Sequence, residues 1–241
     1  MVENILIIDT ETTALEIEQG QVIEIGAILY SVKHQSPIQQ TSTLLPAKQN
    51  PAENINHISI DILLDISVET AEAGIAEICR MAKMADFVIA HNAEFDKKWF
   101  GRKNGEIILP KLLNSQGEEL PWICTYNDFE FPKQTRSHPS LVDLVLAHGI
   151  GVYANHRALT DCQLIAALFD VIEDLQGLFI KAIRPKVRCV ALVSYQERDL
   201  AKQAGFKWFP ETKTWERIIA SEDINSLPFP VLCKNIQNSP K

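Results

Sequence analysis

Apolar residues in the first 180 positions alternate between short uninterrupted runs and helical spacing. Residues 4–9 contain four consecutive branched apolar residues and end in a carboxylate, which is typical of a central strand buried on both faces. Similar runs predict strands at residues 22–32, 41–45 and 87–90. Apolar positions at helical spacing predict helices at residues 67–84, 94–102, 141–147 and 158–175. Strands that alternate with helices indicate an α/β fold.

A different pattern begins after residue 180. Residues 181–188 are basic and contain Pro185, which is typical of a linker. Strands are predicted at residues 187–193, 206–209 and 214–219, with a short helix at 196–204 that Gly205 ends. The pattern therefore divides the chain into a larger domain, residues 1–180, and a small α+β module, residues 185–241.

The two parts differ in charge. The chain has 241 residues and a formal net charge of −8. Residues 1–180 hold 12 Lys and Arg against 25 Asp and Glu, whereas residues 181–241 hold 11 against 6. This asymmetry fits a body that binds cations through carboxylates and a module that contacts a polyanion such as nucleic acid. A chance difference between small domains explains it equally well.

The composition excludes several classes of protein. Apolar residues make up 46% and charged residues 22%, as in ordinary globular proteins. No apolar run approaches the ~18 residues of a membrane span, and the first residues are typical of a strand rather than a signal peptide. The five cysteines are scattered without C-x-x-C spacing. They argue against a zinc site or a disulfide framework and favour a reducing cytoplasm.

Carboxylates occur at the end of the first predicted strand. Asp9 and Glu11 are two positions apart, so both side chains lie on one face of the strand. Two like charges repel unless a cation bridges them, and hard cations such as Mg²⁺ prefer oxygen ligands. One such pair is weak evidence, because an exposed strand end explains it as often.

Two further groups of polar residues follow predicted strand or helix boundaries. His91 and Asn92 come where a buried strand ends, and Asp96 lies on the first turn of the next helix. Ligands of α/β sheets gather at such strand ends. His156 and Asp161 bracket the start of the last long helix, where a lone histidine is more often a capping or packing residue.

The joint order of these groups resembles the histidine-containing (DEDDh) branch of the Asp-Glu-Asp-Asp 3′–5′ exonucleases. That branch includes the DnaQ-like proofreading subunit of bacterial replicative polymerase, ribonuclease T and exodeoxyribonuclease X. The resemblance covers roughly residues 4–175. Its motifs are residues 8–13 (IDTETT), 22–27 (VIEIGA), 91–96 (HNAEFD) and 156–161 (HRALTD). Residues 122–125, placed before a helix, and the pair Asp161-Cys162 look most like exodeoxyribonuclease X.

The resemblance implies a fold and a mechanism. The fold would be RNase H-like, with a mixed five-stranded sheet flanked by helices. Asp9, Glu11, Asp96 and Asp161 would ligate two divalent metal ions, Mg²⁺ or Mn²⁺, for phosphodiester hydrolysis. His156 would be the general base that deprotonates the attacking water, a role that suits a residue type titrating near neutral pH.

The resemblance also implies binding residues. Thr12 and Leu15 would pack against the terminal nucleotide, His57 would lie near it, and His91 and Asn92 would line the site. The chain departs from the family at two positions that are usually glycine, where it has Ala14 and Ile58. Both changes stiffen loops beside the substrate cleft and affect the shape of the terminal-base pocket rather than the chemistry.

Aromatic and basic residues are interleaved in the C-terminal module, which weakly resembles a small module found beside enzymes of DNA metabolism. They are Phe206, Trp208, Trp215, Arg198, Lys202, Lys207, Lys213 and Arg217. Such residues can stack on bases and contact phosphates, whereas a unit this small needs about two of its three aromatics for a core. The module is predicted to raise affinity for DNA without joining in catalysis.

The sequence therefore predicts a metal-dependent 3′–5′ exonuclease that acts on single-stranded DNA ends and releases nucleoside 5′-monophosphates. The first alternative is an RNase T-like or oligoribonuclease-like enzyme that acts on RNA ends. The second is a nucleic-acid-binding adaptor with a vestigial site. The complete carboxylate set argues against the adaptor, because a dead site has no reason to keep five unpaired polar groups facing inward. The oligomeric state stays open.

Overall fold

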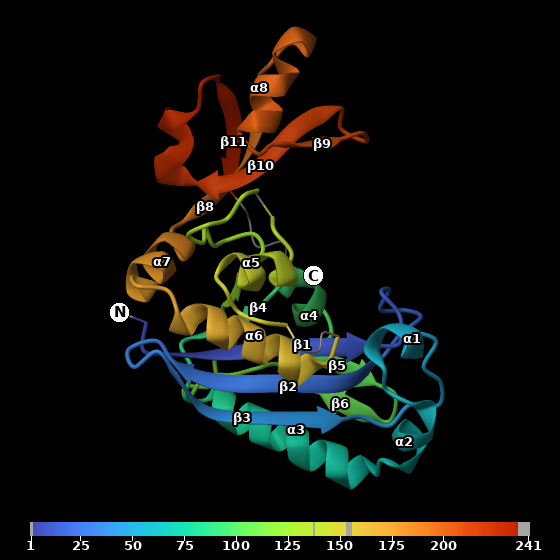
Figure 1. Cartoon of the computed structure of the whole chain (residues 1–241). Helices are drawn as coiled ribbons and strands as arrows, with labels where there is room; N and C mark the ends of the chain where they lie inside the picture. Colours follow the sequence, from blue (N-terminus) through green and yellow to red (C-terminus); the bar gives the residue numbers. More distant parts are fainter. Residues whose placement is uncertain (1, 137, 153–155, 236–241) are drawn as a thin grey trace. The chain divides into compact units, whose positions relative to one another are not determined.

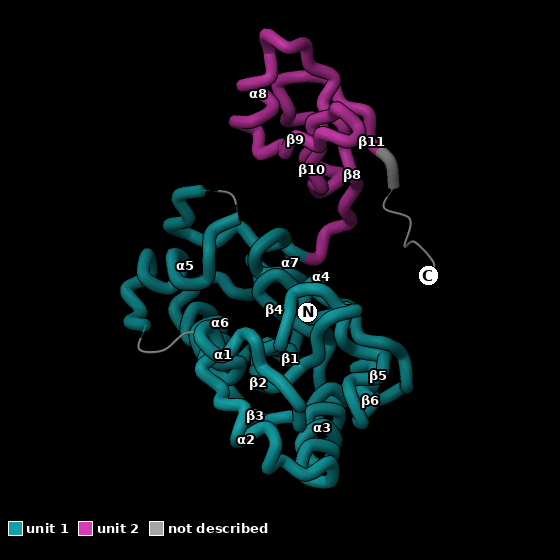
Figure 2. Tube along the Cα trace, turned by 90° about the vertical axis from the view of Figure 1, so that its right-hand side faces the viewer, with its two compact units in different colours: residues 1–182 teal, residues 183–241 magenta. Residues whose placement is uncertain are grey.

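The structure, a computed structural model, describes residues 2–136, 138–152 and 156–235. Its residues form two compact units, Met1–Ala182 and Ile183–Lys241, which are treated separately below (Figure 2). Among the described residues, no helix has the length and apolar character needed to cross a membrane.

The larger unit is built on a mixed five-stranded sheet with the strand order β3-β2-β1-β4-β7. The strands are β1 (Asn4–Thr12), β2 (Val22–Ser31), β3 (Ser36–Leu44), β4 (Phe87–Ala90) and β7 (Trp122–Cys124). Strands β1, β2 and β3 are antiparallel to their neighbours in the chain, whereas β4 runs parallel to both β1 and β7. This sheet and its flanking helices confirm the predicted fold class.

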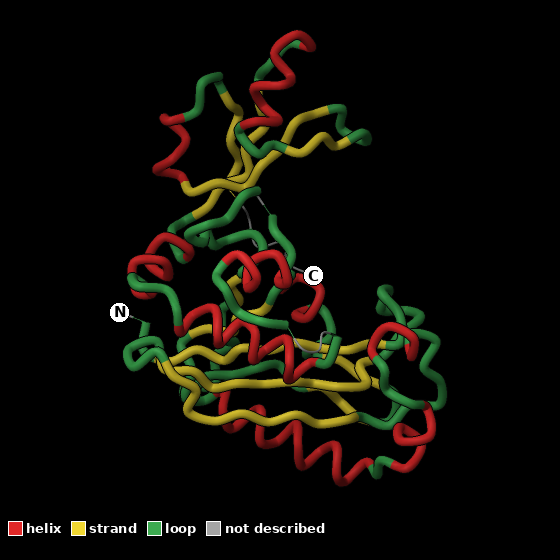
Figure 3. Tube along the Cα trace, in the orientation of Figure 1, coloured by secondary structure: helices red, strands yellow, loops and turns green. Residues whose placement is uncertain are grey.

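Alternate residues of β1 build two separate cores. Ile5 and Ile7 pack toward α5 (Leu141–Ala147), α6 (Ala158–Asp170) and α7 (Leu175–Ala182). Leu6 and Ile8 face the other side, toward α3 (Val68–Ala82). Figures 1 and 3 show these helices on the two faces of the sheet. Burial on both faces explains the uninterrupted apolar run, and it fixes odd-numbered β1 residues on the side of α6.

Several predicted elements have different bounds in the structure. The helix expected at residues 94–102 is only α4 (Ala93–Lys97), because Gly101, with φ of +82°, leads into a hairpin of β5 (Arg102–Asn104) and β6 (Ile107–Leu109). The helix expected at 158–175 ends at Asp170. A new helix follows it, because the Asp174 side chain accepts a hydrogen bond from the Gly177 amide (2.8 Å) at the start of α7.

Other elements were not predicted. Residues 122–124 form the edge strand β7, and the next element in the chain is α5, so residues 122–125 precede a helix as expected. Two short helices, α1 (Glu53–Asn56) and α2 (Ile60–Asp65), lie in the segment between β3 and α3. Residues 181–188, expected to be a linker, instead contain the end of α7 and the start of the next strand.

The smaller unit is a four-stranded antiparallel sheet with the order β11-β8-β10-β9. Its strands are β8 (Lys186–Ala191), β9 (Lys207–Phe209), β10 (Thr214–Ala220) and β11 (Val231–Asn235). The 3-10 helix η1 (Tyr195–Glu197) continues into α8 (Arg198–Gln203), and a second one, η2 (Ser221–Ser226), follows β10. Strand β11 was not predicted, although it pairs with β8 along its whole length.

Cys189 and Cys233 form a disulfide between β8 and β11. The expectation that scattered cysteines argue against disulfides is therefore wrong for this pair. The two residues are 44 positions apart in sequence, yet they are direct cross-strand partners in the sheet. Because the pairing of β11 with β8 is not visible in the sequence pattern, neither is the proximity of these cysteines. Cys79, Cys124 and Cys162 are free.

Candidate active site

The end of β1 turns two carboxylates toward α6. Asp9 and Glu11 continue the odd-numbered series of Ile5 and Ile7, so they lie on the same face of the sheet. Antiparallel pairing with β2 places Asp9 opposite Gly26 and Glu11 opposite Glu24. The sheet therefore carries acidic groups on two neighbouring strands at the end where β1 finishes and β2 begins.

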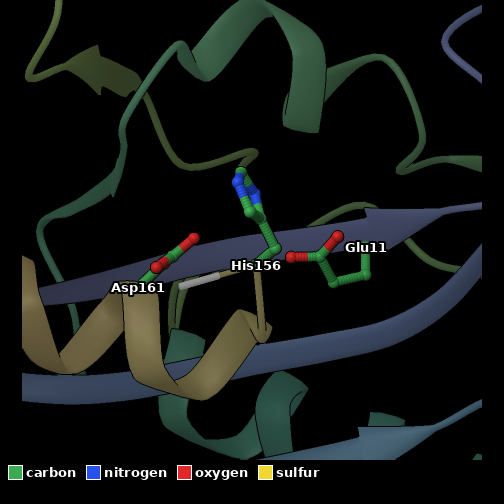
Figure 4. Close-up of side chains that lie close together, drawn as sticks. All are labelled: Glu11, His156 and Asp161. Carbon is green, nitrogen blue, oxygen red and sulfur yellow. The ribbon is translucent and has the colours of Figure 1, made fainter. Parts of the chain in front are cut away.

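The start of α6 supplies the next two predicted residues. His156 lies just before the helix, with φ of 60°, and Asp161 lies on its first turn. Each of Glu11, His156 and Asp161 has one ligand atom within 4.8 Å of the others. Figure 4 shows the His156 side chain between the carboxylates of Glu11 and Asp161. Glu11 on β1 thus meets His156 and Asp161 from a distant part of the chain.

Asp96 reaches the site from the helix that follows β4, the parallel neighbour of β1. It lies on α4, directly after β4, and is buried. The hydroxyl of Thr10 donates a hydrogen bond to the Asp96 carboxylate at 2.7 Å, which links α4 to β1 beside Asp9. Its negative charge raises the pKa of both Asp9 and Glu11, so Asp96 belongs to the same electrostatic cluster.

The cluster has strongly perturbed acids. Burial, followed by the charges of Asp96, Asp161 and Glu11, raises the pKa of Asp9 well above its ordinary value. Burial and then Asp161 raise the pKa of Glu11 to about 8. Burial raises the pKa of Asp96 to about 7, although the Thr10 hydrogen bond opposes the shift. Burial also raises the pKa of Asp161, against the effect of His156. Full ionisation of these carboxylates near neutral pH is therefore costly unless positive charge is added.

Glu24 on β2 fixes the start of α6. Its buried carboxylate accepts hydrogen bonds from Arg157 Nε and Nη2, both at 2.9 Å, and from the Ala158 backbone amide at 3.1 Å. Ser42 donates a fourth hydrogen bond at 2.9 Å. No side chain of α6 caps its own N-terminus, so Glu24 takes this role from another strand. It thereby holds the backbone between His156 and Asp161.

Gly26 allows α6 to approach the sheet. A Cβ atom added at Gly26 would overlap the backbone of Ala158 and Leu159. Because Gly26 is the cross-strand partner of Asp9, the helix start can come close to the strand that carries the acids. A side chain here would separate α6 from β1 and enlarge the distances among the candidate ligands.

Two of the predicted binding residues lie at and just after the end of β1: Thr12 is its last residue, and Leu15 lies in the loop that follows. Thr12 is buried, and its hydroxyl donates to the carbonyl oxygen of Ala14 at 2.9 Å. Leu15 is 73% exposed, so its side chain is open to a ligand. The ammonium of Lys98, at the C-terminal end of α4, donates to the Leu15 carbonyl at 2.6 Å and holds this loop in place.

The other predicted binding residues have separate surroundings. His57 is exposed and ends α1 in the left-handed conformation (φ 57°). His91 shares a hydrogen bond with the Thr125 hydroxyl at 2.9 Å, and burial lowers its pKa to about 4, which keeps the ring neutral. Asn92 is exposed and left-handed (φ 72°) at the start of α4. Ile58, at a position that is usually glycine in the family, is buried in a core with Ile23 and Leu63.

The donor chemistry of the cluster fits divalent cations. Carboxylate oxygens are the ligands that Mg²⁺ and Mn²⁺ prefer, and this cluster adds one imidazole. Burial raises the pKa of Asp9, Glu11 and Asp96, and repulsion from neighbouring carboxylates adds to the shifts of Asp9 and Glu11; a bound cation would oppose these shifts.

Sequence reasoning missed Thr10, Glu24, Gly26, Lys98 and Arg157 as parts of the site. Glu24, Gly26 and Arg157 lie inside quoted motifs, but no role followed from the motifs alone. The composition of β2 offered a signal for Glu24, because Glu24 is the one charged residue in a strand whose other residues are apolar or small. A charged residue inside a fully buried strand needs a partner, and here the partner is Arg157.

Comparisons with known proteins agree with this geometry. Residues 6–169 match the exonuclease family model RNase_T, and residues 188–233 match a domain of unknown function, DUF8626. The chain is 34% identical over 166 residues to a protein of Treponema pallidum named DNA polymerase III subunit epsilon. That match covers 67% of this chain and 72% of the relative.

Solved structures share the fold. The nuclease domain of a 3′-exonuclease described as a DEDDh family member, bound to rAMP, covers 73% of this chain and 93% of its own with a TM-score of 0.51 at 17% identity. A zinc-bound Escherichia coli exonuclease I complex with single-stranded DNA covers 83% of this chain and 50% of its own, with a TM-score of 0.55 at 16% identity. On the family match and the relative, the chain belongs to the RNase T exonuclease family and is a DnaQ-like 3′–5′ exonuclease.

Proposed function

We propose that this exonuclease removes nucleotides from the 3′ end of single-stranded DNA and releases nucleoside 5′-monophosphates. The observation that carries the proposal is the convergence of ligand atoms of Glu11, His156 and Asp161 within 4.8 Å. The half-buried Asp9 and the buried Asp96 belong to the same electrostatic cluster. The relative named as a DNA polymerase III subunit favours DNA over RNA as the substrate. The nuclease chemistry would reside in residues 1–180, with residues 185–241 as a separate module.

Asp9, Glu11, Asp96 and Asp161 would hold two divalent ions, Mg²⁺ or Mn²⁺. When bound, such a pair supplies Lewis acidity for the attacking water and for the leaving 3′-oxygen. The protein's own part is to keep four carboxylates together despite their repulsion. Asp9 and Glu11 are held by the pairing of β1 with β2, and Asp96 by the Thr10 hydroxyl.

His156 would act as the general base in this scheme. An imidazole nitrogen would accept the proton of the attacking water and pass it to solvent, to which the residue is exposed. The nearby Asp161 carboxylate would stabilise the imidazolium that forms, since the two groups already attract each other. The Glu24–Arg157 ion pair holds the backbone on which His156 sits.

The terminal nucleotide would contact the end of β1 with the loop after it, the end of α1 and the start of α4. Leu15 offers an exposed apolar surface for its base or sugar, next to the hydroxyl-bearing Thr12. His57, His91 and Asn92 would supply polar contacts. Because His91 is held neutral by burial, it can share a hydrogen bond with substrate without adding charge.

An oligonucleotide assay tests the proposed function. DNA and RNA of one sequence, each labelled at the 5′ end, are incubated with the full chain and Mg²⁺. We expect labelled products that shorten stepwise from the 3′ end, with DNA degraded faster than RNA. Immediate release of a short labelled product would contradict the polarity, and faster loss of RNA would contradict the substrate.

The role of His156 is tested in the same assay. His156→Ala should slow cleavage by about 10²–10⁴-fold, the usual contribution of a general base. His34→Ala is the matched control, because His34 is an exposed histidine in the turn between β2 and β3. An unchanged rate for His156→Ala would remove His156 from the mechanism.

A further inference from the structure

The sheet of the smaller unit has one covered face and one open face. Cys189, Ala191 and Trp215 lie on the covered face, where they pack with Ala201 of α8 and with Phe206. The strand register places the intervening residues of β8, β9, β10 and β11 on the opposite side. We call that side the open face; it includes Lys186, Arg188, Lys207, Phe209, Ile218 and Leu232.

Apolar side chains of the open face are exposed to an unusual degree. Leu232 is 54% exposed, Ile218 is 44% exposed and Phe209 is 43% exposed. Phe206 on the covered side, by contrast, is 3% exposed. Of the three aromatics singled out in the sequence, Phe206 is buried in the core and Trp215 packs against it, as predicted for two of them, whereas Trp208 is 47% exposed. An aromatic ring on an open strand surface is a platform on which a base can stack.

The open face is also basic. Lys186, Arg188 and Lys207 bring three positive charges against one acidic residue in the same rows, Glu216, which pairs with Arg188 at 3.6 Å. Glu216 also accepts a hydrogen bond from the Thr214 hydroxyl at 2.7 Å. Residues 183–241 hold ten Lys and Arg against six Asp and Glu, in a chain whose net charge is −8. The net charge of this unit is thus positive, opposite in sign to that of the rest of the chain.

We propose that the open face binds single-stranded DNA. Arg188 and Lys207 contact phosphates, and Phe209 stacks on a base. Protein–protein interfaces are depleted in lysine, whereas surfaces that bind single-stranded nucleic acid combine cations with aromatic rings. The composition of the open face therefore favours nucleic acid over a protein partner. The choice of DNA rests on the proposed function, because the same chain carries the exonuclease.

Binding of the full chain to a 5′-fluorescent oligothymidylate of about 15 nucleotides tests the proposal, with EDTA present to prevent cleavage. The double variant Arg188→Gln/Lys207→Gln should raise Kd about tenfold at low salt and flatten the plot of log Kd against log salt by about 1.4, the value for two lost phosphate contacts. Phe209→Ala should also raise Kd about tenfold but leave the salt slope unchanged.

Two controls separate the open face from net charge and from misfolding. Arg198→Gln/Lys202→Gln removes the same charge from α8, over the covered face, and should change Kd less than about twofold. The charge-preserving variant Arg188→Lys/Lys207→Arg should bind as the wild type does. Thermal melts establish that each variant is folded.

Equal losses in the two charge-removing variants would overturn the proposal, since net charge alone would then account for binding. No loss in either variant would overturn it as well. So would binding of RNA of the same sequence, or of polyglutamate, more tightly than DNA through the same residues. Cleavage of a short oligonucleotide by each variant is measured separately. If the open-face variants cleave normally and also bind DNA as the wild type does, the DNA-binding inference fails while the proposed function stands. If the wild type does not cleave the oligonucleotide, the proposed function fails.

Discussion

Glu24 and Arg157 form a two-pronged ion pair that joins β2 to the start of α6. Both guanidinium nitrogens, Nε and Nη2, lie 2.9 Å from Glu24 carboxylate oxygens, and the next backbone amide, of Ala158, binds the same group. Arg157 follows His156 directly, and Asp161 lies one helical turn further on. A buried acid outside the predicted ligand set thus holds the backbone next to His156 and Asp161.

Removal of the Glu24 carboxylate should affect both stability and turnover. Glu24→Ala leaves the α6 amide and Arg157 without their partner, so we expect the free energy of unfolding to fall by about 1–3 kcal/mol. We expect kcat to fall about tenfold with little change in KM, because Glu24 acts through His156 and Asp161. Chemical denaturation and steady-state cleavage measure the two effects.

Two variants control for this experiment. Glu24→Gln keeps an acceptor for the Ala158 amide and should recover part of both losses. Glu77→Ala breaks the exposed pair with Arg80 on α3 and should change stability by less than about 1 kcal/mol without effect on kcat. A Glu24→Ala protein that is less stable but fully active would show that the ion pair does not position the site.

The close approach of α6 to β2 at Gly26 gives a second prediction. Gly26→Ala forces a Cβ into the backbone of Ala158, so the helix start must move. We expect a loss of about 1–3 kcal/mol in unfolding free energy and a lower cleavage rate. Gly151→Ala is the control, because a Cβ there meets nothing within 4 Å. Equal behaviour of the two variants would mean that helix spacing at Gly26 does not matter.

The raised pKa values predict how stability depends on pH without metal. Glu11 shifts from 4.5 to about 8 and Asp96 from 3.8 to about 7. At pH values between the unfolded and the folded pKa of each acid, the folded chain binds more protons than the unfolded chain. The free energy of unfolding therefore falls as pH rises through this range. We expect Tm in EDTA to decrease from about pH 5 to about pH 8.

Added Mg²⁺ or Mn²⁺ should reverse this loss, and its effect on Tm should be larger at pH 8 than at pH 5. Glu11→Gln removes one of the repelling acids and should flatten the metal-free profile. A wild-type Tm in EDTA that rises across this window would contradict the acidic cluster.

The sequence pattern predicts those parts of the candidate site that depend on residues close together in the chain. The alternation of β1 places Asp9 and Glu11 on one face, and the end of β4 places Asp96 close behind it. These relationships extend over a few residues. The pattern also located the start of α6, where His156 and Asp161 stand.

Relationships that depend on strand register were not predictable in this way. The pairing of Glu11 with Glu24, and of Cys189 with Cys233, arises only when distant strands align. A single short strand such as β11 carries too little periodicity to be distinguished from a loop. The role of Glu24 could be suspected from its place in a buried strand, but its partner could not.

The central claim is that the acids from β1, α4 and α6 bind divalent ions together. The most direct measurement is a crystal structure of the full chain with Mn²⁺, in which anomalous scattering locates the ions. We predict two peaks about 3.5–4 Å apart, coordinated by Asp9, Glu11, Asp96 and Asp161. Ions bound elsewhere, with these four carboxylates uncoordinated, would contradict the account.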